Sequence, residues 1–315
     1  METINLAYPH QFEKNSLPET VAAIGVFDGI HRGHQQVIQT AIDKAKRQDR
    51  QSAVITFYPH PSVVLKQEKE KVSYLTPLRE KTEILKSMGV DKLYIITFNK
   101  ELSKLQPQMF IDHFLIGLNI KHLVAGFDFT YGHMGKGTME TINQYTRGEF
   151  NHTTVNKLEE NDQKISSTLI REKLVDGEVE VANHLLGRPH TIRGIVIEGD
   201  KRGRTIGFPT ANIKLSDDFF LPRTGVYAVT IKHNRQLFKG MANVGYKPTF
   251  ESKSDRPSIE VNIFDYNQDI YGEELVIEWR SYIREEKKFN GIEQLVAQIK
   301  QDEKTIRTFF HVNRV

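Results

Sequence analysis

The stretch VAAIGVFDGIHRGHQQVI (residues 21–38) decides the fold of the first half of the chain. It opens with a short continuous apolar run, which is typical of a buried strand. A glycine-containing loop with His31 and His34 follows. After Gly33 the apolar residues recur at the spacing of one helix face, at Val37, Ile38, Ala41, Ile42 and Ala45. The stretch therefore predicts a strand, a tight loop and an amphipathic helix.

The same alternation of strand and helix continues along the first half of the chain. Further apolar runs occupy residues 53–58, 93–98 and 122–129. Residues 76–89 predict a helix with Thr76 as its N-cap, a proline in its first turn and Gly89 at its end. This alternation predicts a parallel sheet covered by helices on both faces. Such sheets bind ligands at the carboxyl ends of their strands, where the loop with the two histidines lies.

The second half of the chain has a different pattern. Apolar and polar residues alternate with the period of a strand over residues 191–198, 225–234, 236–245, 258–265 and 274–283. The pattern predicts an antiparallel barrel or sandwich. A final helix has Ile292, Leu295, Val296 and Ile299 on one face, which we expect to close the barrel. The change of pattern places the domain boundary between residues 1–184 and 185–315.

Composition limits the class of protein. A chain of 315 residues with 38% hydrophobic content favours two domains over one core. Its net charge of +3 is too small for a surface that coats nucleic acid. The absence of cysteine excludes disulfides, thiolate zinc sites and cysteine nucleophiles, and fits a reducing compartment. We find no signal-peptide pattern and no apolar run of membrane-spanning length, so we expect a soluble cytoplasmic protein.

The loop between the first strand and helix has the features of an anion site. A helix that begins near Gly33 offers free backbone N–H groups and the positive end of its dipole to the strand tips. His31 and His34 are three residues apart, so they can share a face and donate hydrogen bonds to a phosphate. A zinc pair or two ordinary surface histidines are the alternatives, but a zinc pair lacks a third ligand nearby and does not explain the glycines.

Three further segments of the first domain carry candidate binding residues. In KISSTLIREKL (164–174), hydroxyls and a guanidinium could surround one phosphate, although a capped helix with a surface arginine is the simpler interpretation. The segment GFDFTYGHMGKGT (126–138) could contact a ribose and an aromatic ring, or be an ordinary glycine-rich loop. The prolines of TFYPHP (56–61) could simply stiffen a turn.

A second candidate site lies in GDKRGRTIGFPTANI (199–213). Gly199, Gly203 and Gly207 are equally spaced, and Thr210 and Asn212 follow a proline. The segment lacks the G-K-[S/T] of a Walker A loop. It is suited to a glycine-rich flap over phosphates, with Thr210 and Asn212 as neutral oxygen ligands of a magnesium ion, or to a hairpin loop with a basic solvated face.

Together these motifs resemble a known family. GVFDGIHRGH (25–34) and KISSTLIREKL resemble the H-x-G-H and I-S-S-T-x-I-R motifs of the nucleotidylyltransferase superfamily, and GFPTAN (207–212) resembles the signature of riboflavin kinase. The whole chain is similar to bacterial bifunctional riboflavin kinase/FMN adenylyltransferase. The resemblance implies an N-terminal Rossmann-like domain that converts FMN and ATP to FAD and pyrophosphate. It implies a C-terminal β-barrel domain that converts riboflavin and ATP to FMN and ADP, with Mg²⁺ as cofactor.

The resemblance also implies roles for individual residues. Glu260, on the strand of residues 258–265, matches the general base of riboflavin kinase, and His31 and His34 match the catalytic histidines of adenylyl transfer. The implied ATP-binding residues of the first domain are Gly25, Phe27, Asp28, Gly33, Asp128, Ser167, Thr168 and Arg171. Its implied flavin-binding residues are Pro59, Pro61 and Tyr131. In the kinase domain the implied ATP-binding residues are Gly199, Lys201, Gly203, Gly207, Thr210 and Asn212, with Thr210 and Asn212 at the metal.

Two alternatives to the bifunctional enzyme remain at this stage. A homologue with a single activity, such as a riboflavin kinase alone, would need a damaged motif, and we see none. A flavin-sensing regulator that binds RNA would need a concentrated basic and aromatic surface, for which the charge of the second half is too mild. We therefore expect small-molecule partners, no membrane and no nucleic acid, and a monomer or weak homo-oligomer.

Overall fold

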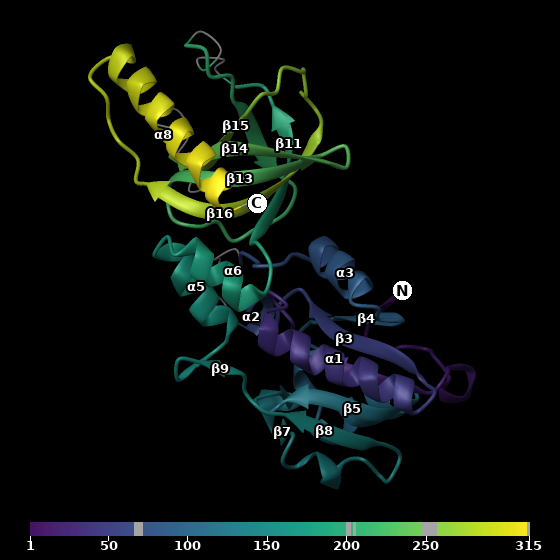
Figure 1. The fold of residues 1–315 in the computed structure, drawn as a ribbon. Coiled ribbons are helices and arrows are strands. Elements are labelled where there is room, and N and C mark those ends of the chain that lie inside the picture. The colour runs from purple at the N-terminus through teal and green to yellow at the C-terminus, as the bar shows by residue number, and fades with distance from the viewer. Residues whose placement is uncertain (66–71, 200–202, 204–205, 247–256, 314–315) are drawn as a thin grey trace. The chain divides into compact units, whose positions relative to one another are not determined.

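A computed structural model describes residues 1–65, 72–199, 203, 206–246 and 257–313 of the chain. The chain divides into two compact units, Met1–Ser167 and Thr168–Val315 (Figure 1). Among the described residues, no helix combines the length and apolar character needed to cross a bilayer.

The first unit is built on a six-stranded sheet in the order β1-β4-β3-β2-β5-β8. All of its strand pairs are parallel. The strands are β1 (Glu2–Leu6), β2 (Thr20–Ile24), β3 (Gln51–Tyr58), β4 (Lys92–Thr97), β5 (Ile120–Gly126) and β8 (Asn151–Val155). The four strands expected from the apolar runs are confirmed, and β1 and β8 are added at the two edges.

Residues of β2 alternate between two hydrophobic clusters, one on each face of the sheet. Ala22 and Ile24 belong to one cluster, whereas Val21 and Ala23 belong to the other. A strand buried on both faces requires a continuous apolar run, which is why the pattern in the sequence is unbroken. The predicted cover of both sheet faces is therefore confirmed.

Helix α1 (Arg32–Arg47) follows β2 and buries the predicted stripe of Val37, Ile38, Ala41, Ile42 and Ala45. Helix α3 (Leu78–Ser87) begins after Pro77, which occupies the N-cap position without a side-chain hydrogen bond. The prediction of Thr76 as N-cap is therefore wrong. The backbone N–H of Thr76 instead donates to the carboxylate of Asp28 at 3.0 Å, which ties the approach to α3 to the β2–α1 loop.

Short elements complete the first unit. They are α2 (Pro61–Leu65), α4 (Pro107–Phe110), the π-helical segment η3 (Ile111–Ile116), the ribbon of β6 (Thr130–Tyr131) with β7 (Gly137–Thr138), and the ribbon of β9 (Glu159–Glu160) with β10 (Gln163–Lys164). Single 3₁₀ turns are η1 (Lys14–Ser16), η2 (Leu102–Lys104), η4 (His133–Gly135) and η5 (Ile142–Gln144).

The second unit contains a closed antiparallel barrel in the order β11-β12-β15-β14-β13-β16. Its strands are β11 (Thr191–Ile197), β12 (Ala211–Leu215), β13 (Gly225–His233), β14 (Gln236–Gly245), β15 (Ser258–Ile263) and β16 (Glu274–Arg284). Five of them match the runs of period two, so the barrel prediction is confirmed. β12 was not expected, because the glycines and the proline before it indicate a loop.

In the part of the second unit that the structure describes, the barrel is accompanied by α5 (Ser167–Val175), α6 (Val179–Leu186) and α8 (Ile292–Val312). The side-chain amide of Asn183, in α6, donates to the carbonyl of Trp279, and its oxygen accepts from the backbone N–H of His190. These bonds hold α6 to β16. Ser167 begins α5 but belongs to the first compact unit, and the rest of α5 belongs to the second.

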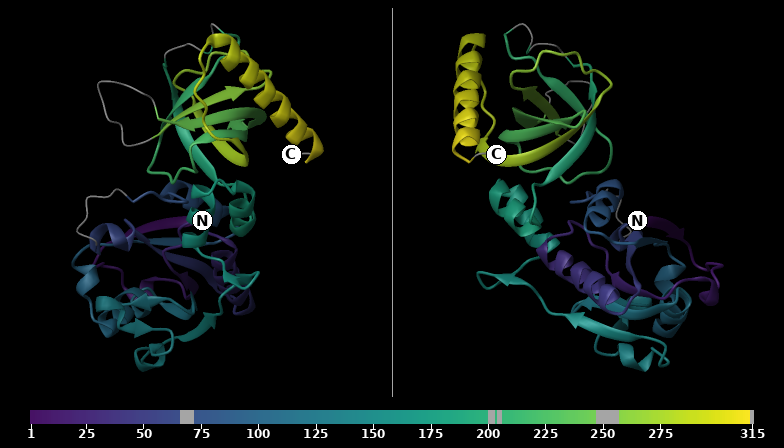
Figure 2. Two further views of the ribbon diagram at one scale, coloured as in Figure 1. Left: turned by 90° about the vertical axis from the view of Figure 1, so that its left-hand side faces the viewer. Right: turned by 45° about the vertical axis from the view of Figure 1, so that its right-hand side comes forward.

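Helix α8 lies against the barrel wall, as Figure 2 shows. Only part of its predicted apolar face makes this contact. Ile306 and Phe310 are buried and Ile299 packs beside them. Ile292, by contrast, is 63% exposed. The prediction of a closing C-terminal helix is confirmed, and Ile299 of the predicted face packs there. The packed face extends from Ile299 to Phe310, about two turns beyond Ile292, and Leu295 lines a cavity.

Candidate active sites

The first candidate site lies where the strand order of the parallel sheet reverses. Within the sheet, β3 is the neighbour of β2 on one side, and β5 is its neighbour on the other side. Ligands of open parallel sheets bind at such a switch point, outside the carboxyl ends of the strands. The β2–α1 loop follows β2, Pro59 and Pro61 follow β3, and Asp128 follows β5. The topology thus brings these three predicted segments to neighbouring strand ends.

His31 and His34 form one unit at the start of α1. His31 is the N-cap residue, and its Nδ1 accepts a hydrogen bond from the backbone N–H of His34 at 3.2 Å. The two imidazole rings stack with centroids 3.6 Å apart, and the Phe27 ring meets His34 edge-on at 5.3 Å. His31 is buried at 5% exposure. The pair therefore stands at the positive end of a helix dipole, as an anion site requires.

Two glycines of the loop make room for these rings. A Cβ atom at Gly33 would lie 3.2 Å from Cε1 of His31, and one at Gly25 would lie 2.9 Å from Cε1 of Phe27. Sequence reasoning assigned Gly33 to a close approach of the helix start to an anion. In the structure the atoms that approach Gly33 are those of the His31 ring.

Asp28 anchors the loop from within. It is buried at 4% exposure, and its carboxylate accepts the backbone N–H groups of Leu75 at 3.3 Å and Thr76 at 3.0 Å. Its carbonyl oxygen accepts the hydroxyl of Ser167 at 2.8 Å. The structure thus brings the predicted residues Asp28 and Ser167 together, and it gives the Asp28 carboxylate two partners from the protein itself.

The other predicted residues of the first unit differ in exposure. Asp128 is exposed and forms an ion pair with Lys164, whose ammonium lies 4.7 Å above the ring of Phe127. Tyr131 is 4% exposed and packs in the hydrophobic core, with the Phe110 ring centroid at 5.7 Å. Burial raises the pKa of its hydroxyl. The Tyr131 ring is thus a core side chain in this structure.

Thr168 and Arg171 belong to α5 in the second unit, so they are described with the barrel. The Arg171 guanidinium lies 5.6 Å from the ring centroid of Phe220 in the same unit. That these two residues join the histidines at one phosphate stays a prediction.

The second candidate site is set by the register of three barrel strands. Glu260 on β15 pairs with Asn212 on β12 and with Asn243 on β14. Residues paired across neighbouring strands point to the same face of the sheet. The carboxylate therefore stands between two amides. Asn243 was not predicted from the sequence. The alternation with period two shows which residues of a strand share a face, but it does not show that the strand of Asn243 lies next to that of Glu260.

Gly199 and Gly203 lie close to the two predicted metal ligands. A Cβ at Gly199 would lie 2.1 Å from Nδ2 of Asn212, and one at Gly203 would lie 3.3 Å from Oγ1 of Thr210. Gly207 has a φ of +84°, which favours glycine. Gly199 therefore leaves the space that Asn212 occupies, whereas Gly203 leaves space first for the carbonyl oxygen of Phe208, which would lie 2.3 Å from its Cβ, and then for Thr210. Lys201, also predicted for this site, lies outside the described residues.

Two cavities of the barrel unit flank the strand that carries Glu260. The Glu260 cavity, of about 330 Å³, is lined by Glu260, Asn262 and Asn243 and by apolar side chains that include Phe208, Phe289 and Leu295. The Tyr266 cavity, of about 210 Å³, is lined by Val261, Ile263 and two tyrosines. The alternation along β15 thus turns its polar residues to one cavity and its apolar residues to the other.

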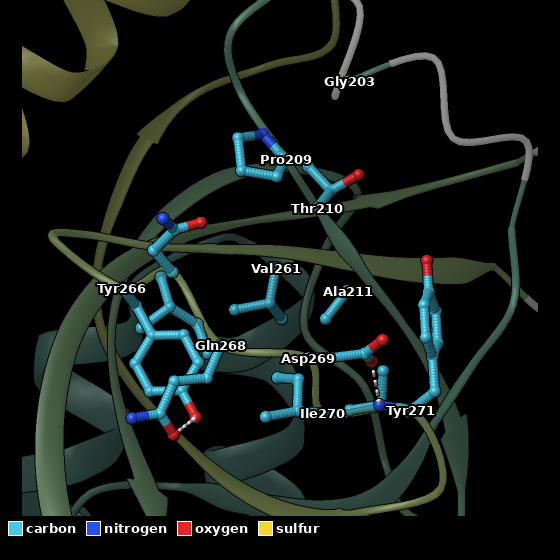
Figure 3. A pocket seen from close by; sticks show the side chains of 13 residues that line it. Gly203, Pro209, Thr210, Ala211, Val261, Tyr266, Gln268, Asp269, Ile270 and Tyr271 are labelled. Carbon is cyan, nitrogen blue, oxygen red and sulfur yellow. Dashed lines mark hydrogen bonds between the residues drawn. The ribbon is translucent and has the colours of Figure 1, made fainter.

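The two cavities share Gly203 and Thr210 among their lining residues. In Figure 3, Tyr266 and Tyr271 stand on opposite sides of the Tyr266 cavity, and Pro209 and Thr210 lie along its upper edge. The amide of Asn262 donates to the carbonyl of Pro209 at 2.7 Å, which fixes the backbone next to Thr210. A group bound in one cavity can therefore meet a group bound in the other at Thr210.

Arg284 and Asp302 line the Glu260 cavity and join α8 to the barrel. The Arg284 Nε lies 3.0 Å from both carboxylate oxygens of Asp302, and Asp302 is 3% exposed. Gln298 also donates to this carboxylate at 2.8 Å. A buried carboxylate with four hydrogen bonds, three of them from Arg284, has a fixed position, so this contact holds the wall of the cavity that α8 contributes.

Comparison with known proteins gives matches for both units. The family model of FAD synthetase matches residues 13–169, and that of riboflavin kinase matches residues 186–310. The bifunctional riboflavin kinase/FMN adenylyltransferase of Bacillus subtilis (strain 168) is 50% identical over 316 residues, covering 100% of both chains. The protein of the same name from Listeria monocytogenes is 48% identical, covering 98% of both. A crystal structure described as a macrolide-efflux protein from Streptococcus pneumoniae is 37% identical, with a TM-score of 0.86, and the match covers 98% of this chain and 99% of that one.

Proposed function

This chain belongs to the family of bifunctional riboflavin kinases/FMN adenylyltransferases, and from that premise we propose which of its residues carry each reaction. The chain phosphorylates riboflavin to FMN with ATP and transfers the adenylyl group of a second ATP to FMN, which releases pyrophosphate and gives FAD. We assign adenylyl transfer to residues 1–184 and phosphorylation to residues 185–315. The two family models support this division, because each matches a different part of the chain. The description of the Streptococcus structure belongs to that protein and is not transferred.

One observation carries the assignment in the barrel: Glu260 stands between Asn212 and Asn243 and lines a cavity that meets a second cavity at Thr210. We assign riboflavin to the Glu260 cavity, because aromatic and apolar side chains line it beside the carboxylate. ATP then occupies the Tyr266 cavity with its phosphates directed to Thr210. This arrangement suits an in-line transfer between the two substrates.

In the kinase reaction the ribityl 5′-hydroxyl oxygen forms a bond to the γ-phosphorus of ATP, and the bond from that phosphorus to the bridging oxygen of ADP breaks. Glu260 accepts a hydrogen bond from the hydroxyl and takes its proton late in the transfer. A carboxylate is a weak base for an alcohol, so its main contribution is to orient the attacking oxygen. The carboxylate then loses the proton to solvent.

Thr210 and Asn212 fit the role of magnesium ligands. Both supply neutral oxygen atoms, and Gly199 leaves the space that the side chain of Asn212 occupies. The described residues contain no cluster of three histidine, cysteine or carboxylate side chains that could hold a metal by themselves. Mg²⁺ is commonly held by few protein oxygens together with substrate phosphates. When bound, the ion neutralises the charge of the phosphates.

In adenylyl transfer an oxygen of the FMN phosphate forms a bond to the α-phosphorus of ATP, and pyrophosphate leaves. His31 and His34, at the N-terminus of α1, donate hydrogen bonds to the charge on the triphosphate and the leaving group. The stacking of the two rings at 3.6 Å supports a joint role. Ser167, Thr168 and Arg171 complete the nucleotide site in this proposal. Pro59, Pro61 and Asp128 belong to the segments that we assign to the flavin and ribose side, and Tyr131 supports its segment from within the hydrophobic core.

We propose a monomer or weak homo-oligomer as the working form. Both reactions consume ATP, so we propose the cytoplasm, where ATP is supplied, as their location. The near-neutral net charge gives no support to binding of nucleic acid.

A time course tests the proposal. Purified protein is incubated with riboflavin, ATP and Mg²⁺, and riboflavin, FMN and FAD are separated by chromatography. We expect FMN to appear first and then to be replaced by FAD. Accumulation of FMN without FAD would contradict the assignment in the first unit. If riboflavin remained while supplied FMN became FAD, the assignment of Glu260 and Thr210 would be wrong.

A further inference from the structure

A lysine that the mechanism above does not use lies inside the first unit. Lys81, on α3, is 3% exposed. Burial lowers the pKa of its ammonium group to about 8, and the nearby Asp28 carboxylate acts in the opposite direction. Burying a charge is costly unless it is paired and hydrogen-bonded. A side chain such as methionine would fill similar space without that cost, so the position of this ammonium needs an explanation.

The ammonium group of Lys81 is directed at one backbone carbonyl. Its Nζ donates to the oxygen of Val26 at 2.7 Å. The hydroxyl of Thr56, on β3, donates to the same oxygen at 3.0 Å and lies 3.4 Å from Nζ. Val26 comes two residues after the end of β2 and begins the loop that leads to His31. Lys81, which lies on the neighbouring helix α3, thus fixes the first peptide group of that loop.

The loop needs such support, because its backbone is strained. Phe27 has a φ of 50° and Ile30 a φ of 37°, and Gly29 lies between them at 89°. Left-handed conformations of non-glycine residues cost on the order of 1–3 kcal/mol each and persist only where the surroundings enforce them. His31 follows Ile30 directly. A change at the start of the loop therefore changes the position of the histidine and of the first turn of α1.

We propose that Lys81 is a positioning residue for adenylyl transfer, which holds the Val26 carbonyl and so fixes His31 and the N-terminus of α1 against the triphosphate. The inference rests on the proposed role of His31 in that reaction. Lys81 touches no substrate in this account. Its effect passes through residues 26–30, of which Asp28 is held separately by Leu75 and Thr76.

The test compares Lys81→Met with Lys86→Met, a control on an exposed position of the same helix. Removal of the ammonium should lower kcat of FMN adenylyl transfer at least about tenfold, because misplaced groups lose transition-state contacts. The KM values for FMN and ATP should change less than kcat. Riboflavin kinase activity of the same chain should stay within about twofold, since the barrel is a separate unit. Lys86→Met should leave both activities unchanged.

Hydrogen–deuterium exchange supplies a readout that a general loss of stability would not give. In Lys81→Met the amides of residues 25–31 should exchange faster, whereas those of β5 should exchange as in the unchanged protein. Thr56→Val, which removes the other donor to Val26, should have the same effect on the loop with a smaller loss of kcat. This variant keeps the shape of the side chain and tests the inference even if Lys81→Met folds poorly.

Three results would overturn the inference: an unchanged kcat in Lys81→Met, faster exchange throughout the sheet, or an unchanged loop in Thr56→Val. The variant His31→Asn separates this failure from that of the proposed function. Should His31→Asn keep full adenylyl transfer, the assignment of the histidine site fails and the inference falls with it. If His31→Asn is inactive and Lys81→Met is fully active, only the inference fails.

Discussion

The β2–α1 loop and the face around Glu260 are built in opposite ways. In the first unit, the two histidines and the glycines around them come from ten consecutive residues, 25–34, and contacts from outside hold that loop in a strained shape. In the barrel, Asn212, Asn243 and Glu260 come from three strands far apart in sequence, and the hydrogen-bonded register alone places them side by side.

This difference has consequences for mutation. A site on a loop depends on anchors that touch no ligand, so remote substitutions can damage it. A site on a barrel wall is held by many backbone hydrogen bonds, so its geometry should survive the loss of a single side chain. The activity of barrel variants should then depend only on the chemical group that was changed. The activity of variants near the β2–α1 loop should also depend on whether the loop has moved.

The largest effect is expected for Glu260→Gln. The neutral amide keeps the shape and the register, but it holds the attacking hydroxyl less strongly than the carboxylate does and does not take its proton, so riboflavin kinase kcat should fall about a hundredfold or more. FAD formation from supplied FMN should stay within about twofold, because the two sites are separate. Initial rates of both reactions check the prediction, with Glu293→Gln on the exposed start of α8 as the matched control. Loss of both activities in a folded variant would contradict the separation of the sites.

The reverse pattern is expected for His31→Asn. Asparagine is a favoured N-cap residue and can accept from the N–H of His34 as the imidazole does, so the helix should stay intact. Loss of the imidazole should still lower adenylyl transfer about a hundredfold, since donors to a developing charge have effects of this size. Kinase activity should persist. His311→Asn, at an exposed position of α8, is the control. If His31→Asn kept its adenylyl-transfer activity, His31 would act only as the N-cap of α1 and not in the reaction.

The same contrast explains how much the sequence could predict. The parallel sheet, the buried stripe of α1 and the loop with its histidines were predicted, because each follows from the periodicity or the spacing of neighbouring residues. The pairing of Asp28 with the N–H groups of Leu75 and Thr76 was not, because it joins residues 47 and 48 positions apart. The prediction of Thr76 as an N-cap did not take this contact into account.

In the barrel the sequence predicted the strands but not their neighbours. Gly207 and Pro209 indicate a loop, and they concealed that β12 begins at Ala211. Without β12 the strand order is incomplete, so Asn243 could not be recognised beside Glu260. The packed face of α8 was predicted only in part, for a related reason. Apolar residues at the start of a helix look alike whether they pack on a barrel or line a cavity, as Leu295 does.

A smaller effect is expected for Asn262→Ala, which tests whether the barrel site also depends on an anchor. The change removes the hydrogen bond to the carbonyl of Pro209 and leaves Glu260 in place. A lost hydrogen bond of this kind costs about 1 kcal/mol, so KM for ATP in the kinase reaction should rise about fivefold while kcat changes little. Adenylyl transfer should be unaffected. A fall in kcat as large as that of Glu260→Gln would show that the barrel site is as dependent on anchors as the loop.

The smallest effect concerns His122, on β5, whose Nε2 lies 2.8 Å from the hydroxyl of Thr153. Burial lowers the pKa of His122 to about 4, and the positive charges of Lys44, His152 and Arg50 act in the same direction. In the unfolded chain the pKa returns to about 6.5. Between these values the unfolded state binds more protons than the folded one, so the stability of the first unit falls as the pH falls from 6.5 towards 4.

From pH 7 to pH 6 this group should remove about half a kcal/mol from the free energy of unfolding of the first unit. The difference should be smaller by this amount in His122→Gln, which cannot titrate in this range, whereas His10 and His113 keep their own contribution because burial lowers their pKa as well. Trp279, the only tryptophan of the chain, lies in the barrel, so its fluorescence follows the second unit alone. In urea titrations at the two pH values, the far-ultraviolet circular dichroism transition of the unchanged chain should shift relative to His122→Gln, whereas the fluorescence transition should not. Equal shifts in both signals would mean that the two units unfold as one. The difference between the loop site and the barrel site would then not be accompanied by a difference in the stability of the two units.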